Sequence, residues 1–330
     1  MTVGARLLLV HAHPDDESIL NGATIAAAVR AGVRVTLLTC TRGEAGEVLA
    51  ADLAHLAGDG AALGAHRTVE LATAMAALGV TDHRFLADER HPDGFRDSGM
   101  AGTAANQAPD SFARADLLDT ATAVAAVIRD VRPHVLITYD EVGGYGHPDH
   151  VAAHRAAMYA TQLAAAPYRP DLGERWGTPK TYWSALPRSV VAADLTRAGG
   201  GLPPGAVADP LLAADPARWR AHPDPAAQPA VDDALVTTRI DATAELPTKR
   251  AALRAHRSQL AVDGDRYALT NGIATALSGV EWYRLAAGRR GPVDGDGLET
   301  DLFAGLHLGA TSTPVGGANR HAGTPAGWDR

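Results

Sequence analysis

The first half of the chain alternates short apolar runs with longer amphipathic segments. Residues 6–12, 33–40 and 133–139 are apolar almost throughout, which is typical of parallel strands buried on both faces. A shorter strand is expected over residues 83–86. Apolar positions at helical spacing predict helices over residues 23–30, 61–78, 117–131 and 151–166. Strands that alternate with helices in this way predict a doubly wound α/β layer with right-handed crossovers.

The pattern loses its regularity after residue 166. Glycine and proline dominate residues 167–230, and beyond them we expect only a strand near 234–240 and a helix near 245–260. The end of the chain is rich in Ser, Thr, Gly, Pro and Asn, a composition typical of disorder. Three parts are therefore expected: a Rossmann-like catalytic domain with a mostly parallel sheet flanked by helices (1–170), a smaller, less regular C-terminal region that completes the substrate site (171–310), and a disordered tail (311–330).

Composition narrows the class of protein. The formal net charge is -8 over 330 residues, so the chain lacks the basic surface that a nucleic-acid partner requires. The one cysteine, Cys40, excludes an internal disulfide and a thiolate zinc cluster, and we interpret it as a buried strand residue. No apolar run reaches the length of a membrane helix or of a signal peptide, so we expect a cytoplasmic protein without a membrane partner. The sequence does not decide whether the chain forms a homo-oligomer.

Histidines and acidic residues gather in two clusters. His11–Glu17 follows the first predicted strand directly, and Tyr145–His150 follows a later one. Because the carboxyl ends of parallel strands meet at one edge of the sheet, the clusters are expected to form one site. His13, Asp16 and His150 would then offer two imidazoles and one carboxylate to a single Zn²⁺ or Fe²⁺, with coordination positions left open for water and substrate.

The neighbouring residues suit the chemistry of a hydrolase. Asp15 lies between two predicted ligands and is placed to accept a proton from water at the metal, as a general base does. His147 is free to act as a general acid or oxyanion donor, and Asp149 is available to orient an imidazole. Tyr145 could polarise a carbonyl through its hydroxyl. We interpret Glu17 as structural, because it could cap the following helix or hold His11.

Other kinds of site are less consistent with the sequence. No Gly-x-Gly-x-x-Gly follows the first strand, which disfavours a dinucleotide site, and no Gly-x-Ser-x-Gly supports a serine nucleophile. A single His-x-x-Asp pair is common in solvated loops, so the metal prediction depends on both clusters together. A non-catalytic sugar- or nucleotide-binding module on a Rossmann-like scaffold is the alternative from another class. Asp15 argues against it, since binding alone needs no base beside a metal.

The segment Ala12–Glu17, together with His147–His150, resembles the PIG-L/LmbE-like family of zinc-dependent N-acetylglucosamine deacetylases. The resemblance implies one zinc ion per chain held by His13, Asp16 and His150. It implies Asp15 as the base, His147 as acid and oxyanion stabiliser tuned by Asp149, and Tyr145 as the group that polarises the acetyl carbonyl. Further segments resemble the family members that act on N-acetylglucosaminylinositol in mycothiol biosynthesis: His11–Ala28, Cys40–Val48, Arg96–Met100, Gly143–His150 and Glu299–Leu302.

The same resemblance implies a small-molecule sugar-inositol substrate. Arg67, Asp97 and Asn271 are the implied substrate contacts, and acetate and glucosaminylinositol are the implied products. A mycothiol S-conjugate amidase is the alternative within the family. Its pattern has a lysine shortly after the acidic cluster, where this chain reads Ser18–Asn21, and it lacks the Met-ended segment Arg96–Met100. Both differences favour the deacetylase.

Overall fold

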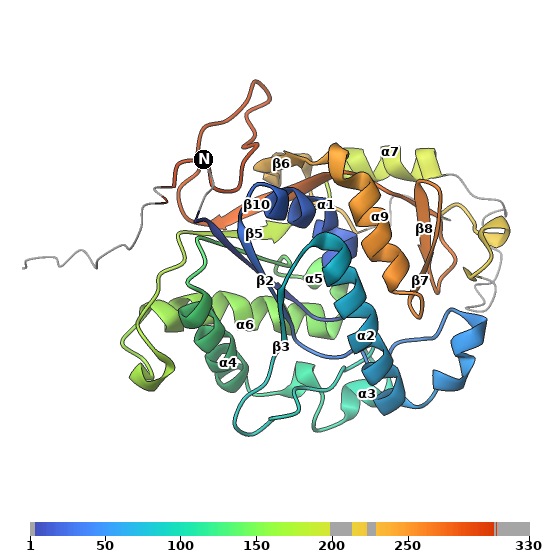
Figure 1. Ribbon diagram of the computed structural model, residues 1–330, viewed down its shortest axis with the longest axis horizontal. Helices are drawn as coiled ribbons and strands as arrows, with labels where there is room; N and C mark the ends of the chain where they lie inside the picture. The colour runs from blue at the N-terminus through green and yellow to red at the C-terminus, as the bar shows by residue number, and fades with distance from the viewer. Residues whose placement is uncertain (1–3, 199–212, 223–228, 307, 309–330) are drawn as a thin grey trace, which may run out of the picture.

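A computed structural model describes residues 4–198, 213–222, 229–306 and 308. Seven strands form one sheet in the order β3-β2-β1-β4-β5-β10-β6, and helices cover both of its faces (Figure 1). These strands are β1 (Arg6–His11), β2 (Arg34–Thr39), β3 (Asp82–Phe85), β4 (Val135–Thr138), β5 (Lys180–Ser184), β6 (Thr238–Asp241) and β10 (Val280–Ala287). A second, antiparallel sheet contains β7 (Leu260–Asp263), β8 (Arg266–Leu269) and β9 (Thr275–Ala276).

Helices connect most of these strands. The α-helices are α1 (Asp16–Arg30), α2 (Gly60–Leu78), α3 (Ala104–Gln107), α4 (Leu117–Val131), α5 (Gly143–Gly146), α6 (Pro148–Ala165), α7 (Arg188–Ala198) and α9 (Leu246–Ala255). Short 3-10 segments are η1 (Ala51–Leu56), η2 (Phe112–Arg114), η3 (Pro170–Leu172), η4 (Pro216–Arg218), η6 (Asp233–Leu235) and η7 (Thr243–Glu245). Within the part of the chain that the structure describes, no helix is both long and apolar enough to span a membrane.

β1 is an interior strand of the sheet and pairs in parallel with β2 and β4. Leu7 and Leu9 enter the core formed with α1 and α2, whereas Leu8 and Val10 enter the core formed with α4 and α6. Both faces of β1 are therefore covered, which explains why the sequence of this strand is apolar without alternation. The predicted Rossmann-like α/β sheet flanked by helices is confirmed.

Two helices begin earlier than their apolar spacing predicts. α1 begins at Asp16 rather than at residue 23, and α6 begins at Pro148 rather than at residue 151. Proline suits the first turn of α6 because it has no N–H to leave unbonded there. The first turns carry buried polar side chains, such as Glu17 and Asp149, so the hydrophobic pattern begins only after them.

The C-terminal region contributes to the same sheet as the first 170 residues. β10 lies between β5 and β6 and runs antiparallel to both. Sequence patterns predicted neither β5 nor β10, because buried positions of these strands hold charged side chains, Lys180 in β5 and Glu281 in β10. The sheet thus continues across the boundary expected at residue 170. The predicted helix over 245–260 ends at Ala255, and the tail expected over 311–330 lies outside the described residues.

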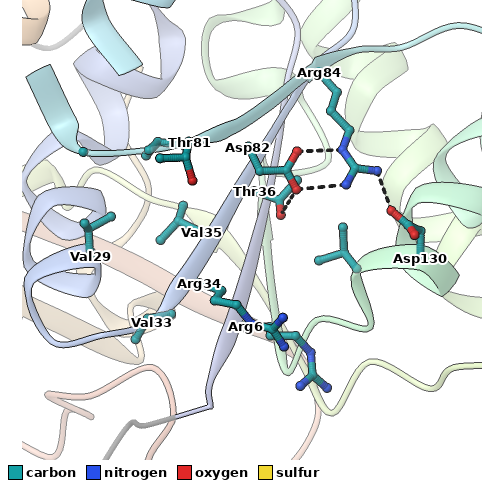
Figure 2. Close-up of a pocket in the computed structure, with 13 residues that line it drawn as sticks. Arg6, Val29, Val33, Arg34, Val35, Thr36, Thr81, Asp82, Arg84 and Asp130 are labelled. Carbon is teal, nitrogen blue, oxygen red and sulfur yellow. Dashed lines mark hydrogen bonds and ion pairs between the residues drawn. The ribbon is translucent and has the colours of Figure 1, made fainter. Parts of the chain in front are cut away.

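A cavity of about 320 Å³ opens near the amino ends of β1, β2 and β3 (Figure 2). Figure 2 shows Arg84 between two carboxylates, with 2.7 Å contacts to Asp82 and Asp130. The charge of Arg84 is therefore compensated within the protein. The cavity lies at the end of the sheet opposite to His11, the last residue of β1. It is thus remote from the predicted chemistry.

A buried ion pair fastens the C-terminal region to the sheet. Lys180 Nζ on β5 lies 2.7 Å from Glu299 Oε1, and both side chains are fully buried. The other oxygen, Glu299 Oε2, accepts hydrogen bonds from Tyr182 (2.9 Å) and from Thr238 on β6 (3.0 Å). Burial opposes ionisation of Glu299, but the Lys180 and Gly291 donors hold its pKa below the usual range. One carboxylate thus joins both of the strands that flank β10.

Replacing Glu299 by Ala should destabilise the protein by about 3–5 kcal/mol, because Lys180 would remain buried without a counter-charge. A carboxyl whose pKa is lower in the folded state stabilises the fold above its unfolded-state pKa, and this contribution is lost as the pH falls through the folded pKa. Glutamine does not titrate, so the free energy of unfolding of Glu299→Gln should fall less than that of the wild type as the pH is lowered. Urea unfolding between pH 3 and pH 7, roughly the range of carboxyl titration, measures both effects. A cost below about 1 kcal/mol for Glu299→Ala would contradict the assignment.

Candidate metal centre

The two predicted clusters meet at the carboxyl ends of β1 and β4. These strands are neighbours in the sheet and run parallel, so the segments that follow them leave on the same edge. The ring centroids of His13 and His147 are 4.6 Å apart, and those of His147 and His150 are 5.1 Å apart. The expectation that residues distant in sequence form one cluster is correct.

The histidines lie close enough to share one ion. His13, His147 and His150 each offer a nitrogen within 4.8 Å of the nitrogens of the other two. Asp16, the predicted third ligand, has Oδ2 at 3.5 Å from His13 Nδ1 and Oδ1 at 3.3 Å from His150 Nε2. The carboxylate of Asp16 therefore lies beside both predicted histidine ligands, and His147 is a second possible neighbour of the same ion.

The hydrogen bonds of two histidines leave one ring nitrogen of each facing Asp16. His150 donates from Nδ1 to the carbonyl of Gly143 (3.2 Å), and its buried Nε2 makes no hydrogen bond. His13 donates from Nε2 to Asp149 Oδ2 (3.1 Å), which leaves its Nδ1 on the side of Asp16. Metal-binding histidines are commonly oriented by such a bond from the other ring nitrogen. Two imidazole nitrogens that face one carboxylate fit a divalent transition metal ion.

Tyr139 positions Asp16 and was not recognised from the sequence. Its hydroxyl donates to Asp16 Oδ2 (2.7 Å) and accepts from the backbone N–H of Ala12 (2.7 Å). Burial opposes ionisation of Asp16, but the imidazoles of His150 and His13 hold its pKa well below the usual range. Tyr139 directly follows β4, so its place at the sheet edge was visible in the sequence, although its contact with Asp16 was not.

Asp15 combines a strained backbone with a buried ion pair. Its φ of 130° and ψ of -32° lie outside the regions that L-residues normally adopt. The carboxylate accepts from Arg67 at 3.1 Å, and the Arg67 guanidinium also donates to the carbonyls of Gly43 (2.8 Å) and Pro14 (2.6 Å). Burial raises the pKa of Asp15 to about 6, although the Arg67 cation opposes this rise. Arg67, implied as a substrate contact, is 3 % exposed and holds Asp15.

The imidazole that the Asp149 carboxylate contacts is that of His13, whereas the family resemblance implies a contact with His147. The carboxylate of Asp149 accepts from the backbone N–H of Ser98 (2.9 Å) and from its hydroxyl. Only the backbone N–H of Asp149 reaches His147, where it donates to Nδ1 (3.1 Å). Burial, together with the nearby His13 and His150, lowers the pKa of His147 to about 3. His147 is therefore a neutral imidazole with its proton on Nε2.

Asp97 brings the long loop between β3 and α4 into the site. Its Oδ1 accepts from the backbone of Gly99 (2.8 Å) and lies 3.4 Å from His13 Nε2, while Oδ2 accepts from the backbone of Ala45 (3.1 Å). His13, Asp97 and Asp149 form a second group with metal-binding spacing, but His13 Nε2 already donates to Asp149 there. The carboxylate of Asp97 thus holds two loops together around His13.

Two predicted residues, Tyr145 and Asn271, are more exposed than those described above. Tyr145 is 55 % exposed, and its ring centroid is 5.0 Å from that of His150. The surrounding protein and the carboxylate of Asp16 raise the pKa of Tyr145, which keeps its phenol protonated. Asn271 is exposed in the turn between β8 and β9, where its side chain accepts from the backbone of Ile273 (2.9 Å). Of the predicted residues, Asp16, Asp97, Asp149 and Tyr145 lie against the histidines, and Arg67 lies against Asp15. Within the described residues, the side chain of Asn271 makes no hydrogen bond or ion pair with any of them.

Glu17 has a structural contact that the sequence only partly indicated. Its Oε2 accepts from the backbone N–H of Asp15 (3.0 Å), as a cap at the start of α1 would. Its Oε1 accepts from His256 Nε2 (2.9 Å), while His11 instead donates to Asn21 (2.8 Å). No sequence signal pointed to His256, because it lies far along the chain in the turn between α9 and β7.

Cys40 is buried and its thiol pKa is raised, which excludes it as a nucleophile.

Comparison with known proteins adds to this geometry. The PIG-L family, described as GlcNAc-PI de-N-acetylase, matches residues 8–161, which include both clusters. A curated protein of Geodermatophilus obscurus is 50 % identical over 310 residues, covering 93 % of this chain and 99 % of that protein. It is named 1D-myo-inositol 2-acetamido-2-deoxy-alpha-D-glucopyranoside deacetylase.

Two solved structures share the fold at 18 % sequence identity. N,N'-diacetylchitobiose deacetylase from Pyrococcus horikoshii has a TM-score of 0.50 and covers 77 % of this chain and 70 % of its own. GalB, the 4-carboxy-2-hydroxymuconate hydratase from Pseudomonas putida KT2440, has a TM-score of 0.52 and covers 88 % and 99 %. Because a deacetylase and a hydratase share this architecture, the fold alone does not decide the reaction.

The ligand set can be tested by metal content. Asp16→Ala and His150→Ala should each lose bound divalent metal, because the two ligands that remain hold an ion poorly. His147→Ala should keep it, since we assign His147 to the substrate side of the site. Metal titration of the three purified variants, with elemental analysis, measures the difference. Loss of metal from His147→Ala and its retention in Asp16→Ala would instead identify the three histidines as the ligands.

Proposed function

Since this chain belongs to the PIG-L family of GlcNAc-PI de-N-acetylases, we propose that it hydrolyses the N-acetyl group of N-acetylglucosaminylinositol. The products would be acetate and glucosaminylinositol, in the deacetylation step of mycothiol biosynthesis. The observation that carries this proposal is the 50 % identity across 93 % of the chain to a protein named for this activity. The arrangement of Asp15, Asp16 and the three histidines supports it, because it offers a base beside a metal-binding set. We further propose that the reaction takes place in the cytoplasm.

We assign one zinc ion per chain to His13, Asp16 and His150, with ferrous iron as the alternative. Their nitrogen and carboxylate donors suit either ion. When bound, such a cation activates water and polarises the amide carbonyl. The observation that favours this assignment is that Nε2 of His150 is buried and makes no hydrogen bond. Buried polar atoms normally have a partner, and a bound cation would be the partner of this nitrogen.

Asp15 is the proposed general base. With a pKa raised to about 6, its carboxylate is ionised at neutral pH and is more basic than an exposed aspartate. Arg67 fixes its direction and keeps it charged. The proton that Asp15 takes from water is then available to the amine nitrogen when the C–N bond breaks. This return of the proton balances the hydrolysis, since water supplies a hydroxyl to the acetyl group and a hydrogen to the amine.

His147 and Tyr145 are proposed to stabilise the negative charge that develops on the acetyl oxygen. The neutral imidazole of His147 carries its proton on Nε2, so it serves better as a hydrogen-bond donor than as an acid. Tyr145 remains protonated, and its side chain is exposed, so a substrate could reach its hydroxyl from solvent. Asp149 would contribute by orienting His13, the ring that it contacts.

The proposed activity is tested by amine release from N-acetylglucosaminylinositol with the metal-loaded protein. We expect this substrate to be hydrolysed with a higher kcat/KM than a mycothiol S-conjugate. Asp15→Asn should retain metal and lose about 10²-fold or more in kcat, the usual effect of removing a general base. Faster hydrolysis of the conjugate would assign the chain to the amidase reaction, and the absence of hydrolysis of either compound would refute the proposal.

Arg67 should set the pH at which activity is lost on the acid side. Protonation of Asp15 removes the base, so kcat falls as the pH drops through the pKa of Asp15. Arg67→Met removes the cation that lowers this pKa, so the acid limb should move to higher pH. Arg67→Lys keeps the charge and should shift the limb less. Profiles of kcat against pH for the two variants and the wild type check this, and a limb that stays in place in Arg67→Met would assign it to another group.

A further inference from the structure

His256 and Glu17 form a buried pair that the proposed reaction does not use. His256 directly follows α9, Glu17 lies in the first turn of α1, and neither residue is exposed. We propose that His256 is a positioning residue which, through Glu17, holds Asp15 in the conformation that the general base requires. The inference rests on the proposed function of Asp15, and it assigns to the C-terminal region a part in the site.

The backbone of Asp15 needs support because its conformation is unfavourable. A non-glycine residue at φ 130° and ψ -32° costs on the order of 1–3 kcal/mol and persists only where neighbouring contacts fix it. On the carbonyl side, Asp15 accepts from the backbones of Ser18 (3.0 Å) and Ile19 (2.9 Å), which begin α1. On the amide side, its N–H donates to Glu17 Oε2. The side chain of Glu17 is thus the contact that holds the amide of Asp15.

His256 in turn fixes the direction of the Glu17 carboxylate. Oε1 of Glu17 accepts from His256 Nε2 (2.9 Å) and from the Ser18 hydroxyl (2.6 Å). The opposite ring nitrogen, His256 Nδ1, is buried and makes no hydrogen bond. The hydrogen bonds of His256 toward the site therefore come from one ring nitrogen, which faces Glu17 and its neighbour Ser18.

The chain around His256 is anchored independently of Glu17. Ser258 donates to both oxygens of Glu70 on α2, from its N–H (2.8 Å) and its hydroxyl (2.6 Å). Gln259 donates to the carbonyl of Glu47 (3.0 Å). These bonds fasten residues 256–259 to α2 and to the segment after β2, so His256 is a fixed point for Glu17. α2 also carries Arg67, which holds the carboxylate of Asp15.

Loss of this support should act on the rate rather than on metal or substrate binding. Asp15 is not among the proposed ligands, and among the described residues His256 makes no hydrogen bond to those ligands or to Tyr145. A base displaced by about 1 Å can cost roughly 10²-fold in rate. Loss of a hydrogen bond that supports a metal ligand typically costs about 10- to 100-fold in activity, and we expect a loss of the same order for the support of the base.

The experiment compares His256→Gln with His256→Asn in the full-length, metal-loaded protein. The Gln amide nitrogen can reach the position of Nε2 and restore the donor to Glu17, whereas the shorter Asn amide reaches only the position of Nδ1. We expect His256→Gln to keep kcat within a few-fold of wild type. His256→Asn should lower kcat by about 10- to 100-fold, with KM and metal content unchanged. His134→Asn is the matched control, because it removes a buried, hydrogen-bonded histidine at the other end of the sheet.

A readout without substrate separates this inference from the proposed function. Hydrogen exchange of the Asp15 amide should be faster in His256→Asn than in wild type and in His256→Gln. Equal losses of kcat in the Gln and Asn variants, or an unchanged Asp15 exchange rate in His256→Asn, would overturn the inference. An inactive wild-type protein would refute the proposed deacetylation instead, and the exchange rates would still decide whether His256 holds Asp15.

Discussion

Removing a carboxylate from water costs several kcal/mol unless hydrogen bonds or an opposite charge replace the solvent. The sheet edge beyond β1 and β4 buries several carboxylates side by side, and the local structure follows from their need for partners. Arg67 supplies one positive charge, and hydroxyl and backbone N–H groups supply most of the other contacts. Positive charge is nevertheless scarce at this edge, and a divalent cation between His13, Asp16 and His150 would supply it. The partners are Arg67 for Asp15, Tyr139 for Asp16, Ser98 for Asp149 and His256 for Glu17.

The parallel pairing of β1 with β4 makes this concentration of charge possible. It brings His13 and Asp16 to the same edge as His147 and His150, although the two pairs are far apart in sequence. The helices that follow begin within the clusters themselves, so their first turns carry the functional side chains. The strain at Asp15 arises at this junction between strand and helix, where the chain turns sharply. Backbone strain of this kind is often found at functional sites.

The sequence predicted the parts of the site that depend on local order. The two clusters lie in the segments that follow β1 and β4, and the carboxyl ends of these parallel strands meet, so His13, Asp16 and His150 could be placed near one another without coordinates. The contacts between distant segments could not be predicted. Ser98 reaches Asp149 because an irregular loop folds back, and His256 reaches Glu17 because a turn after α9 docks on α2. β10 was missed because its buried positions hold Glu281 and Tyr283 rather than aliphatic side chains, so its burial does not show in the hydrophobic pattern.

The insertion of β10 between β5 and β6 has a consequence for how the protein folds. When the ribosome has released β5, the strand that will cover its free edge has not yet been synthesised. Until β10 arrives, β5 is an open edge with unpaired backbone groups, which is the type of surface that invites aggregation. Contacts between segments so distant in sequence also slow folding. Maturation of the enzyme is therefore tied to completion of its C-terminal region, and a truncated chain that ends before β10 would be a substrate for chaperones and proteases rather than a smaller enzyme.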